Sequence, residues 1–273
     1  MSVGWWLLRR DGSIILALLL LMGLSAASLP SLVQGESCVL TSLQAGVTFP
    51  VEKVDPVWAC RLQSIIGNYT TANKVGPIRA ALSESMYQYL LDRPPLAAAL
   101  INRLDLGLYK AERRGPGRYW GNDGEGTEGI VELAYQDRTS RIYYLVGSHH
   151  SRLLPNMTGK AVVLLRMNPV KEASGAEAMD SMMVSYVKLD NRILSGLVSL
   201  LRPLIGGIVT RKLAKGVEAV NRLGLEMRER PERVLFEATD PPSLPAEDVA
   251  FLKVAFGSQQ NPHLSGQTKT TKP

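Results

Sequence analysis

Residues 191–230, with the sequence NRILSGLVSLLRPLIGGIVTRKLAKGVEAVNRLGLEMRER, decide the fold of this chain. Apolar residues recur through this stretch every three or four positions, which predicts a helix that buries one face. Charged residues lie mostly between them, so we expect an amphipathic helix rather than a membrane span. Pro203 and the glycine pair at 206 and 207 are expected to bend this helix or to divide it in two. The inward stripe begins with Leu194, Leu197, Val198, Leu201, Leu204, Ile205, Ile208 and Val209.

Composition limits the function classes. The chain has 273 residues, of which 45% are hydrophobic, and can therefore bury a sizeable core. Its formal net charge is +6, but the basic residues are spread along the chain and form no dense block interleaved with aromatic residues. This distribution argues against a nucleic-acid partner, whereas a mild positive balance is compatible with an anionic membrane surface.

Residues 1–30 have the pattern of an export signal. Arg9 and Arg10 precede the apolar run 14–22, and small residues suited to a signal peptidase follow at 23–28. Extended by residues 24–29, the run approaches the roughly 17 residues that a bilayer helix needs, so a retained anchor is the alternative to cleavage. Both alternatives place the rest of the chain outside the cytoplasm, in the periplasm or on the periplasmic face of an inner membrane.

Two cysteines, Cys38 and Cys60, lie in the exported part of the chain. An even pair in an oxidising compartment predicts a disulfide. Two unpaired buried thiols are the alternative. Neither cysteine belongs to a metal-ligand or nucleophile signature, so a metal or catalytic role is not expected.

Changes of pattern divide the chain into four parts. After the signal, residues 31–74 are expected to form an N-terminal extension with a short helix capped by Asp55. The main domain is predicted at 75–232, where two short helices between residues 83 and 104 are followed by strands of period two. Residues 233–273 are expected to be a tail with one short helix near 247–256 and a disordered end. The predicted strands are a weak one at 76–81, two at 106–112 and 117–120, and four better ones at 127–135, 141–148, 160–167 and 182–189.

This order of elements resembles that of the START-like helix-grip superfamily, also called SRPBCC or polyketide cyclase-like proteins, from about residue 75 to residue 230. The resemblance rests on order and pattern, not on a signature motif. It implies an α+β fold in which a curved antiparallel sheet of six or seven strands wraps around a long C-terminal helix. It also implies a cavity for an apolar ligand between the two. Residues 191–230 would correspond to the grip helix and residues 83–104 to the two-helix insert.

Independent physical reasoning gives the same pairing of sheet and helix. A small antiparallel sheet has one face to bury, and the amphipathic helix is the large apolar complement that the chain offers. Adaptable or amphipathic side chains suit a ligand pocket, although simple core packing is the alternative for each of them. The expected lining consists of Tyr144, Met167, Met182, Met183 and Tyr186 from the strands and Leu197, Leu201, Leu204 and Ile208 from the helix.

Catalytic and metal-binding motifs are sparse. His149 and His150 end a predicted strand, where neighbours point to opposite faces, so they are not expected to ligate one metal together. One of them could enter the cavity beside a carboxylate such as Glu132. The acidic turn at 123–128 lacks the spacing of an EF-hand loop and is expected to be a solvated hairpin. We therefore expect no cofactor and no metal.

The leading hypothesis is an exported binding protein, a carrier or sensor of a lipid or other hydrophobic small molecule in the cell envelope. One alternative is an exported cyclase-like or hydrolytic enzyme that uses His149 or His150 with Glu132. Another is an envelope interaction module whose core is filled. The size of the space between helix and sheet separates these three hypotheses.

Overall fold

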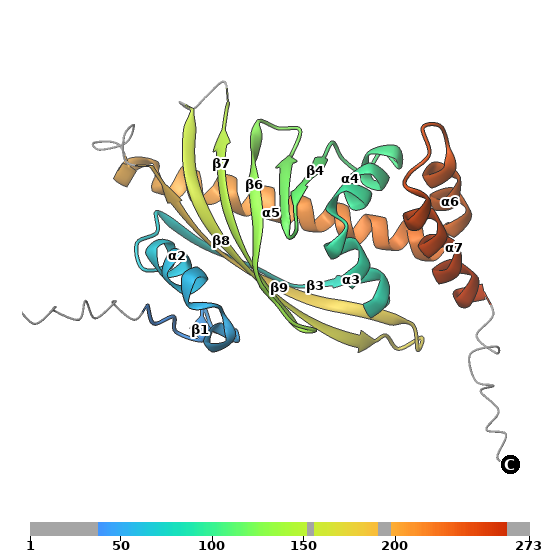
Figure 1. Ribbon diagram of the computed structural model, residues 1–273, viewed down its shortest axis with the longest axis horizontal. Coiled ribbons are helices and arrows are strands. Elements are labelled where there is room, and N and C mark those ends of the chain that lie inside the picture. Colours follow the sequence, from blue (N-terminus) through green and yellow to red (C-terminus); the bar gives the residue numbers. More distant parts are fainter. Residues whose placement is uncertain (1–37, 152–155, 191–197, 261–273) are drawn as a thin grey trace, which may run out of the picture. The chain divides into compact units, whose positions relative to one another are not determined.

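The computed structural model describes residues 38–151, 156–190 and 198–260 (Figure 1). The expected export signal at 1–30 and most of the disordered end expected at 258–273 lie outside this part of the chain, but residues 258–260 are helical rather than disordered. Among the described residues, no helix is long and apolar enough to span a bilayer.

A seven-stranded antiparallel sheet forms the centre of the described unit, with strand order β3-β9-β8-β7-β6-β5-β4. The four better predicted strands and the two predicted before them are present, although the strand expected at 106–112 lies at Lys110–Gly115. The weak strand expected at 76–81 is the end of a longer edge strand, β3. The bounds are β3 Thr71–Ala80, β4 Lys110–Gly115, β5 Arg118–Asn122, β6 Thr127–Gln136, β7 Ser140–His149, β8 Met157–Lys171 and β9 Glu177–Leu189.

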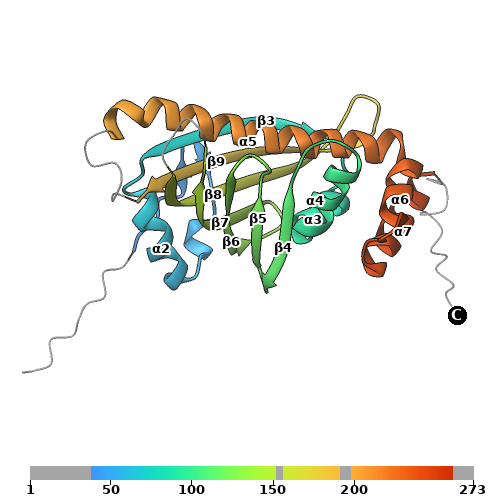
Figure 2. The ribbon, with the colours of Figure 1, turned by 90° about the horizontal axis from the view of Figure 1, so that it is seen from above.

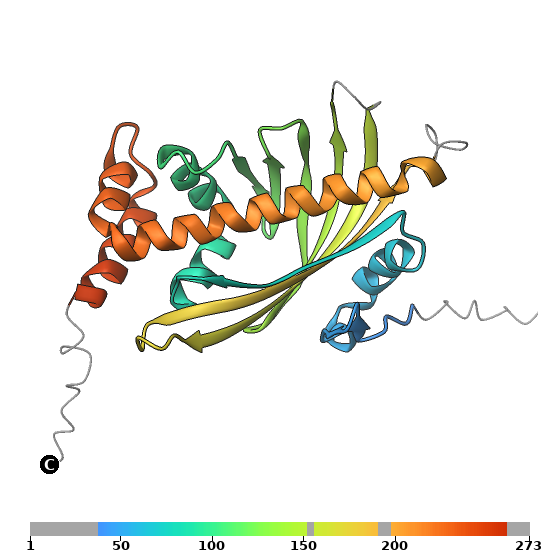
Figure 3. The ribbon, with the colours of Figure 1, turned by 180° about the vertical axis from the view of Figure 1, so that it is seen from behind.

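A long helix, α5 (Val198–Glu229), runs along one face of this curved sheet, as Figures 2 and 3 show. The predicted α+β class, a curved sheet wrapped on a long C-terminal helix, is confirmed. Of the two outcomes expected for Pro203 and the glycine pair, a bend or a division, the division does not occur, because α5 is one helix of 32 residues. Gly206 has a packing role instead: a Cβ added there would lie 3.1 Å from Thr71 Oγ1, so glycine lets α5 approach the edge strand β3 closely.

The opposite face of the sheet is covered by the segment that was expected to be a mere extension. It contains β1 (Leu43–Gln44), β2 (Val47–Thr48), the short 3₁₀ helix Val51–Lys53 and α2 (Pro56–Ile66). This unit buries Phe49, Leu62 and Ile65 against the sheet. The sheet is therefore buried on both faces across β7, β8 and β9, and the expectation of a single buried face was wrong there.

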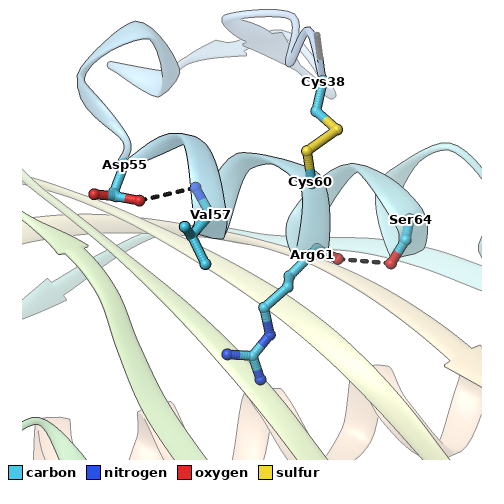
Figure 4. Close-up of a disulfide and its surroundings, with 6 residues drawn as sticks. All are labelled: Cys38, Asp55, Val57, Cys60, Arg61 and Ser64. Atoms are coloured by element: carbon cyan, nitrogen blue, oxygen red, sulfur yellow. Dashed lines mark hydrogen bonds between the residues drawn. A yellow bond between two sulfur atoms is a disulfide. The ribbon is translucent and has the colours of Figure 1, made fainter. Parts of the chain in front are cut away.

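The predicted disulfide between Cys38 and Cys60 is present and holds this covering unit together (Figure 4). Asp55 caps α2, since its Oδ1 accepts from the Val57 backbone N–H at 2.8 Å. A buried hydrogen bond of 2.7 Å from the Tyr186 hydroxyl to Gln44 Oε1 ties the unit to β9. The covering unit is thus fixed to the sheet by apolar burial and by a specific polar contact.

Helices close the remaining end of the domain. The predicted two-helix insert is α3 (Glu84–Asp92) and α4 (Pro94–Arg103). It packs with α5, α6 (Pro231–Thr239) and α7 (Ala246–Gln260) in one apolar core. The Tyr89 and Phe251 rings stack with centroids 3.5 Å apart, and the Tyr89 hydroxyl donates to Asp248 Oδ1 at 2.7 Å. The first part of the expected tail is therefore a structural part of the domain.

Candidate functional site

A cavity of about 1120 Å³ lies between the inner face of the sheet and α5, with α3 and α4 at one end. Small-molecule sites commonly measure about 300–1,000 Å³, so this space is large enough for a lipid-sized molecule. The hypothesis of a filled core is therefore not supported on this face of the sheet. The strands β4 to β9 and the helix α5 all contribute to the wall.

Apolar side chains from alternate strand positions form most of this wall. In β7, β8 and β9 the inward positions are odd-numbered, as expected when side chains alternate between the two faces of a strand. The helix adds a stripe that recurs every three or four residues. The main apolar residues of the wall are Leu145, Ala161, Val163, Leu165, Met183 and Val187 from the strands and Ile205, Ile208, Val209, Leu213, Ala219 and Leu223 from α5.

A row of four glycines crosses the floor of the cavity. Gly121, Gly129, Gly147 and Gly159 are direct partners on β5, β6, β7 and β8. A Cβ added at Gly129 would lie 2.4 Å from the Val146 carbonyl oxygen, and one at Gly147 would lie 2.5 Å from that of Glu128. At these two positions the backbone of the neighbouring strand lies too close to leave room for a side chain. The glycine row thus permits the curvature that creates the cavity.

The end of the cavity beside α3 is called the inner end here, and the opposite end is called the outer end. At the outer end, ion pairs join the β5–β6 turn to α5. Lys212 Nζ donates to Asp123 Oδ2 at 2.5 Å, and Lys215 pairs with Glu125. Burial alone would raise the pKa of Asp123, but hydrogen bonds from Lys212 and from the Thr127 and Glu125 backbone N–H groups together lower it. Both turn carboxylates therefore stay ionised near neutral pH and hold the turn against the helix.

His149 is the one of the two adjacent histidines that lines the cavity. Its Nδ1 lies 3.0 Å from Thr127 Oγ1. Burial, followed by the charge of Lys212, lowers the pKa of His149. The imidazole is therefore neutral at physiological pH. It offers a polar surface at the outer end of the cavity, and its close side-chain partner is a hydroxyl rather than a carboxylate.

The histidine and carboxylate of the enzyme hypothesis are not brought together. Glu132 lies outside the cavity lining, where it accepts from Arg61 at 3.2 Å and pairs with Arg118 at 3.6 Å. His150 is exposed and is also outside the lining. Among the described residues, no group of three or more histidine, cysteine, aspartate or glutamate side chains could hold a metal ion.

Several strand residues expected in the cavity lie elsewhere. Tyr144 and Tyr186 face the covering unit on the opposite side of the sheet, and Met182 falls on that same side by alternation. Because side chains alternate with a period of two, an error of one position moves a residue to the other face. Met167 has the inward parity but is fully buried in the helical core beyond the cavity. Of the strand residues named, Met183 lines the cavity.

One member of the predicted helix stripe does not face inward. Leu204 is 57% exposed and does not line the cavity, whereas Ile205, also expected in the stripe, is 3% exposed and lines it. Ile208 lines the cavity as expected. Leu197 lies outside the described residues, as does the side chain of Leu201.

Sequence patterns missed the polar inner end of the cavity and the glycine row. Arg141, Tyr143 and Tyr87 line the inner end. Arg141 had been placed on a strand, but nothing in its neighbourhood marked it as buried. The signal for the glycine row was one glycine in each of four successive strands, which gains meaning once the register is known.

No protein-family model matches this sequence, and no curated protein matches it. Solved structures of similar arrangement include a norcoclaurine synthase from Thalictrum flavum, with 18% identity, 57% of this chain and 88% of that chain covered, and a TM-score of 0.37. Ara h 8.0201 matches with 10% identity, 57% and 99% coverage, and a TM-score of 0.30. An uncharacterised protein from Rhizobium leguminosarum matches with 13% identity, 57% and 97% coverage, and a TM-score of 0.33. Identities this low leave the ligand to be argued from the cavity itself.

Proposed function

We propose that this chain is a binding protein for a lipid or other hydrophobic small molecule and acts as a carrier or sensor. The single observation that supports this proposal is the apolar cavity of about 1120 Å³ between the sheet and α5. An apolar occupant of a space of this size would gain dispersion contacts with the apolar side chains of the wall and would therefore be stabilising. Three of the charged residues that line the cavity, Arg141, Lys212 and Asp123, are paired within the protein.

A filling substitution tests whether this cavity is the binding site. Ala161→Trp would place an indole on the concave face, between the register partners Leu145 and Val187. We expect the affinity for the neutral probe N-phenyl-1-naphthylamine to fall about tenfold, a loss of about 1.4 kcal/mol. The control is Val57→Trp on α2, where the native side chain is 72% exposed and lies outside the cavity. This control should bind like the unaltered chain in a fluorescence titration.

Native mass spectrometry of the purified chain, combined with organic extraction, gives a direct test of occupancy. A co-purifying apolar molecule that is lost in Ala161→Trp but kept in Val57→Trp would support the proposal. If the unaltered chain is recovered empty and binds no hydrophobic probe, the binding function is wrong.

The location proposed for this activity is the cell envelope, in the periplasm or on the periplasmic face of an inner membrane. The disulfide between Cys38 and Cys60 supports an oxidising compartment, and the pattern of residues 1–30 supports export. Mass measurement of the chain recovered from fractionated cells tests both points. A reduced chain recovered from the cytoplasmic fraction would contradict them.

A further inference from the structure

The inner end of the cavity, beside α3, is polar although most of the wall is apolar. Arg141 and Tyr143 of β7 line this end together with Asp92 of α3. Arg141 is only 3% exposed. Its Nη1 donates to Asp92 Oδ1 at 2.7 Å, and its Nη2 donates to Gln88 Oε1 at 2.7 Å. The positive charge is therefore matched inside the protein before a ligand enters.

Tyr143 provides a hydrogen-bond donor at this end. Burial raises the pKa of its phenol, and the charge of the neighbouring Arg141 opposes this shift without reversing it. The group therefore keeps its hydrogen at physiological pH. A guanidinium has donors and no acceptor, so a contact with Arg141 cannot use the phenol hydrogen. That hydrogen can be donated to an acceptor oxygen of a ligand.

Charge balance favours a neutral acceptor over an anionic one. Because Asp92 already pairs with Arg141, a carboxylate placed beside Tyr143 would bring an unmatched negative charge into a largely apolar space, which is costly. A carbonyl, ether or hydroxyl oxygen accepts the same hydrogen bond without that penalty. Two of the lysines that line the cavity are likewise paired, Lys212 with Asp123 and Lys215 with Glu125.

We propose that the cavity takes an uncharged, largely apolar molecule with an acceptor oxygen, such as a long-chain alcohol, ester or ketone, and that Tyr143 donates to this oxygen. This inference rests on the proposed binding function and specifies the class of ligand. The apolar part of the molecule lies against Leu145, Val163 and Val187. An ionised fatty acid of equal length is disfavoured by its charge rather than by its size.

Competition between matched probes tests this proposal on the purified chain. At pH 8, 1-dodecanol, methyl dodecanoate and dodecanoate each compete with N-phenyl-1-naphthylamine in a fluorescence displacement titration. We expect the alcohol and the ester to bind at least about tenfold more tightly than the ionised acid. Tyr143→Phe should weaken binding of the alcohol by about 3- to 10-fold, the range for one neutral hydrogen bond. The same variant should change binding of the fluorescent probe by less than about twofold.

Tyr144→Phe is the matched control, because it makes the same substitution one residue further along β7, on the opposite face of the sheet. It should leave both affinities unchanged. Dodecanoate binding as tight as that of the alcohol, or an unchanged alcohol affinity in Tyr143→Phe, would overturn the ligand class and leave the binding function standing. A chain that binds neither the fluorescent probe nor any competitor would overturn both.

Discussion

The two faces of the sheet are built from the same strands but are packed in different ways. On the face toward the covering unit, even-numbered residues of β7, β8 and β9 meet Phe49, Leu62 and Ile65 in a solid core. On the other face, odd-numbered residues of the same strands border the cavity of about 1120 Å³. The first face stabilises the sheet, whereas the second borders the cavity in which we propose that a ligand binds. Stability and binding can therefore be altered separately by substitutions one or a few positions apart.

Truncating a leucine on each face should produce the largest difference. Leu164 is 1% exposed and belongs to the solid core, whereas Leu145 lines the cavity. We expect Leu164→Ala to reduce the free energy of unfolding by about 2–5 kcal/mol. Leu145→Ala should reduce it by less than about 1 kcal/mol, because it enlarges an existing space and removes fewer contacts. Urea denaturation measures both. Equal losses would mean that the two faces are packed alike.

Removing the disulfide should weaken the solid face and leave the cavity unchanged. Cys38 and Cys60 close a loop with a sequence separation of 22 residues. In the chain-entropy model, a loop of this length contributes about 3 kcal/mol. We expect a double Cys→Ser variant to lose about this much stability in urea denaturation while its probe affinity changes by less than about twofold. A large loss of affinity would show that the covering unit also shapes the cavity.

The sequence pattern was sufficient to predict the strands and helices, but not to predict which face of the sheet borders the cavity. Period two predicted the strands, and the spacing of apolar residues predicted α5. However, residues 142–146 of β7 and 161–165 of β8 are apolar at both parities, so alternation could not tell which face was the cavity. Such continuous runs indicate strands that are buried on both faces, and they could have predicted that the extension covers the sheet.

Neither the volume of the cavity nor the register of the strands could be predicted from sequence patterns. The same apolar residues can form a filled core or the wall of a cavity, because the difference depends on sheet curvature rather than on composition. Curvature depends in turn on the glycine row, whose members are far apart in the sequence and become neighbours only through the register of β5 to β8. Likewise, the choice between Leu204 and Ile205 depends on how α5 is rotated against β3.

Alanine substitutions within the glycine row should show whether only the crowded positions, where a side chain would force the strands apart, are needed for the curvature of the sheet. A Cβ at Gly147 would overlap the Glu128 carbonyl oxygen at 2.5 Å, whereas one at Gly121 would meet Lys110 O at 3.8 Å, an ordinary contact. We expect Gly147→Ala to cost about 1–3 kcal/mol of stability and Gly121→Ala to cost less than about 1 kcal/mol. Probe affinity should fall in Gly147→Ala alone. If the two variants behave alike, the row does not set the curvature.

The smallest expected effect is a pH dependence that originates on the cavity face. In the folded chain the pKa of His149 lies below its usual value of 6.5, because the side chain is partly buried and near Lys212. The unfolded chain therefore binds a proton at this residue more readily, so stability should fall as the pH drops from about 7 toward 5. His149→Gln removes the titrating group, and its stability should decline less steeply in urea denaturation over this range. Above about pH 8 the two chains should show parallel profiles, since the imidazole is then neutral in both states. An unchanged slope in the variant would mean that His149 is as solvated in the folded chain as in the unfolded one, and that the outer end of the cavity is open to water.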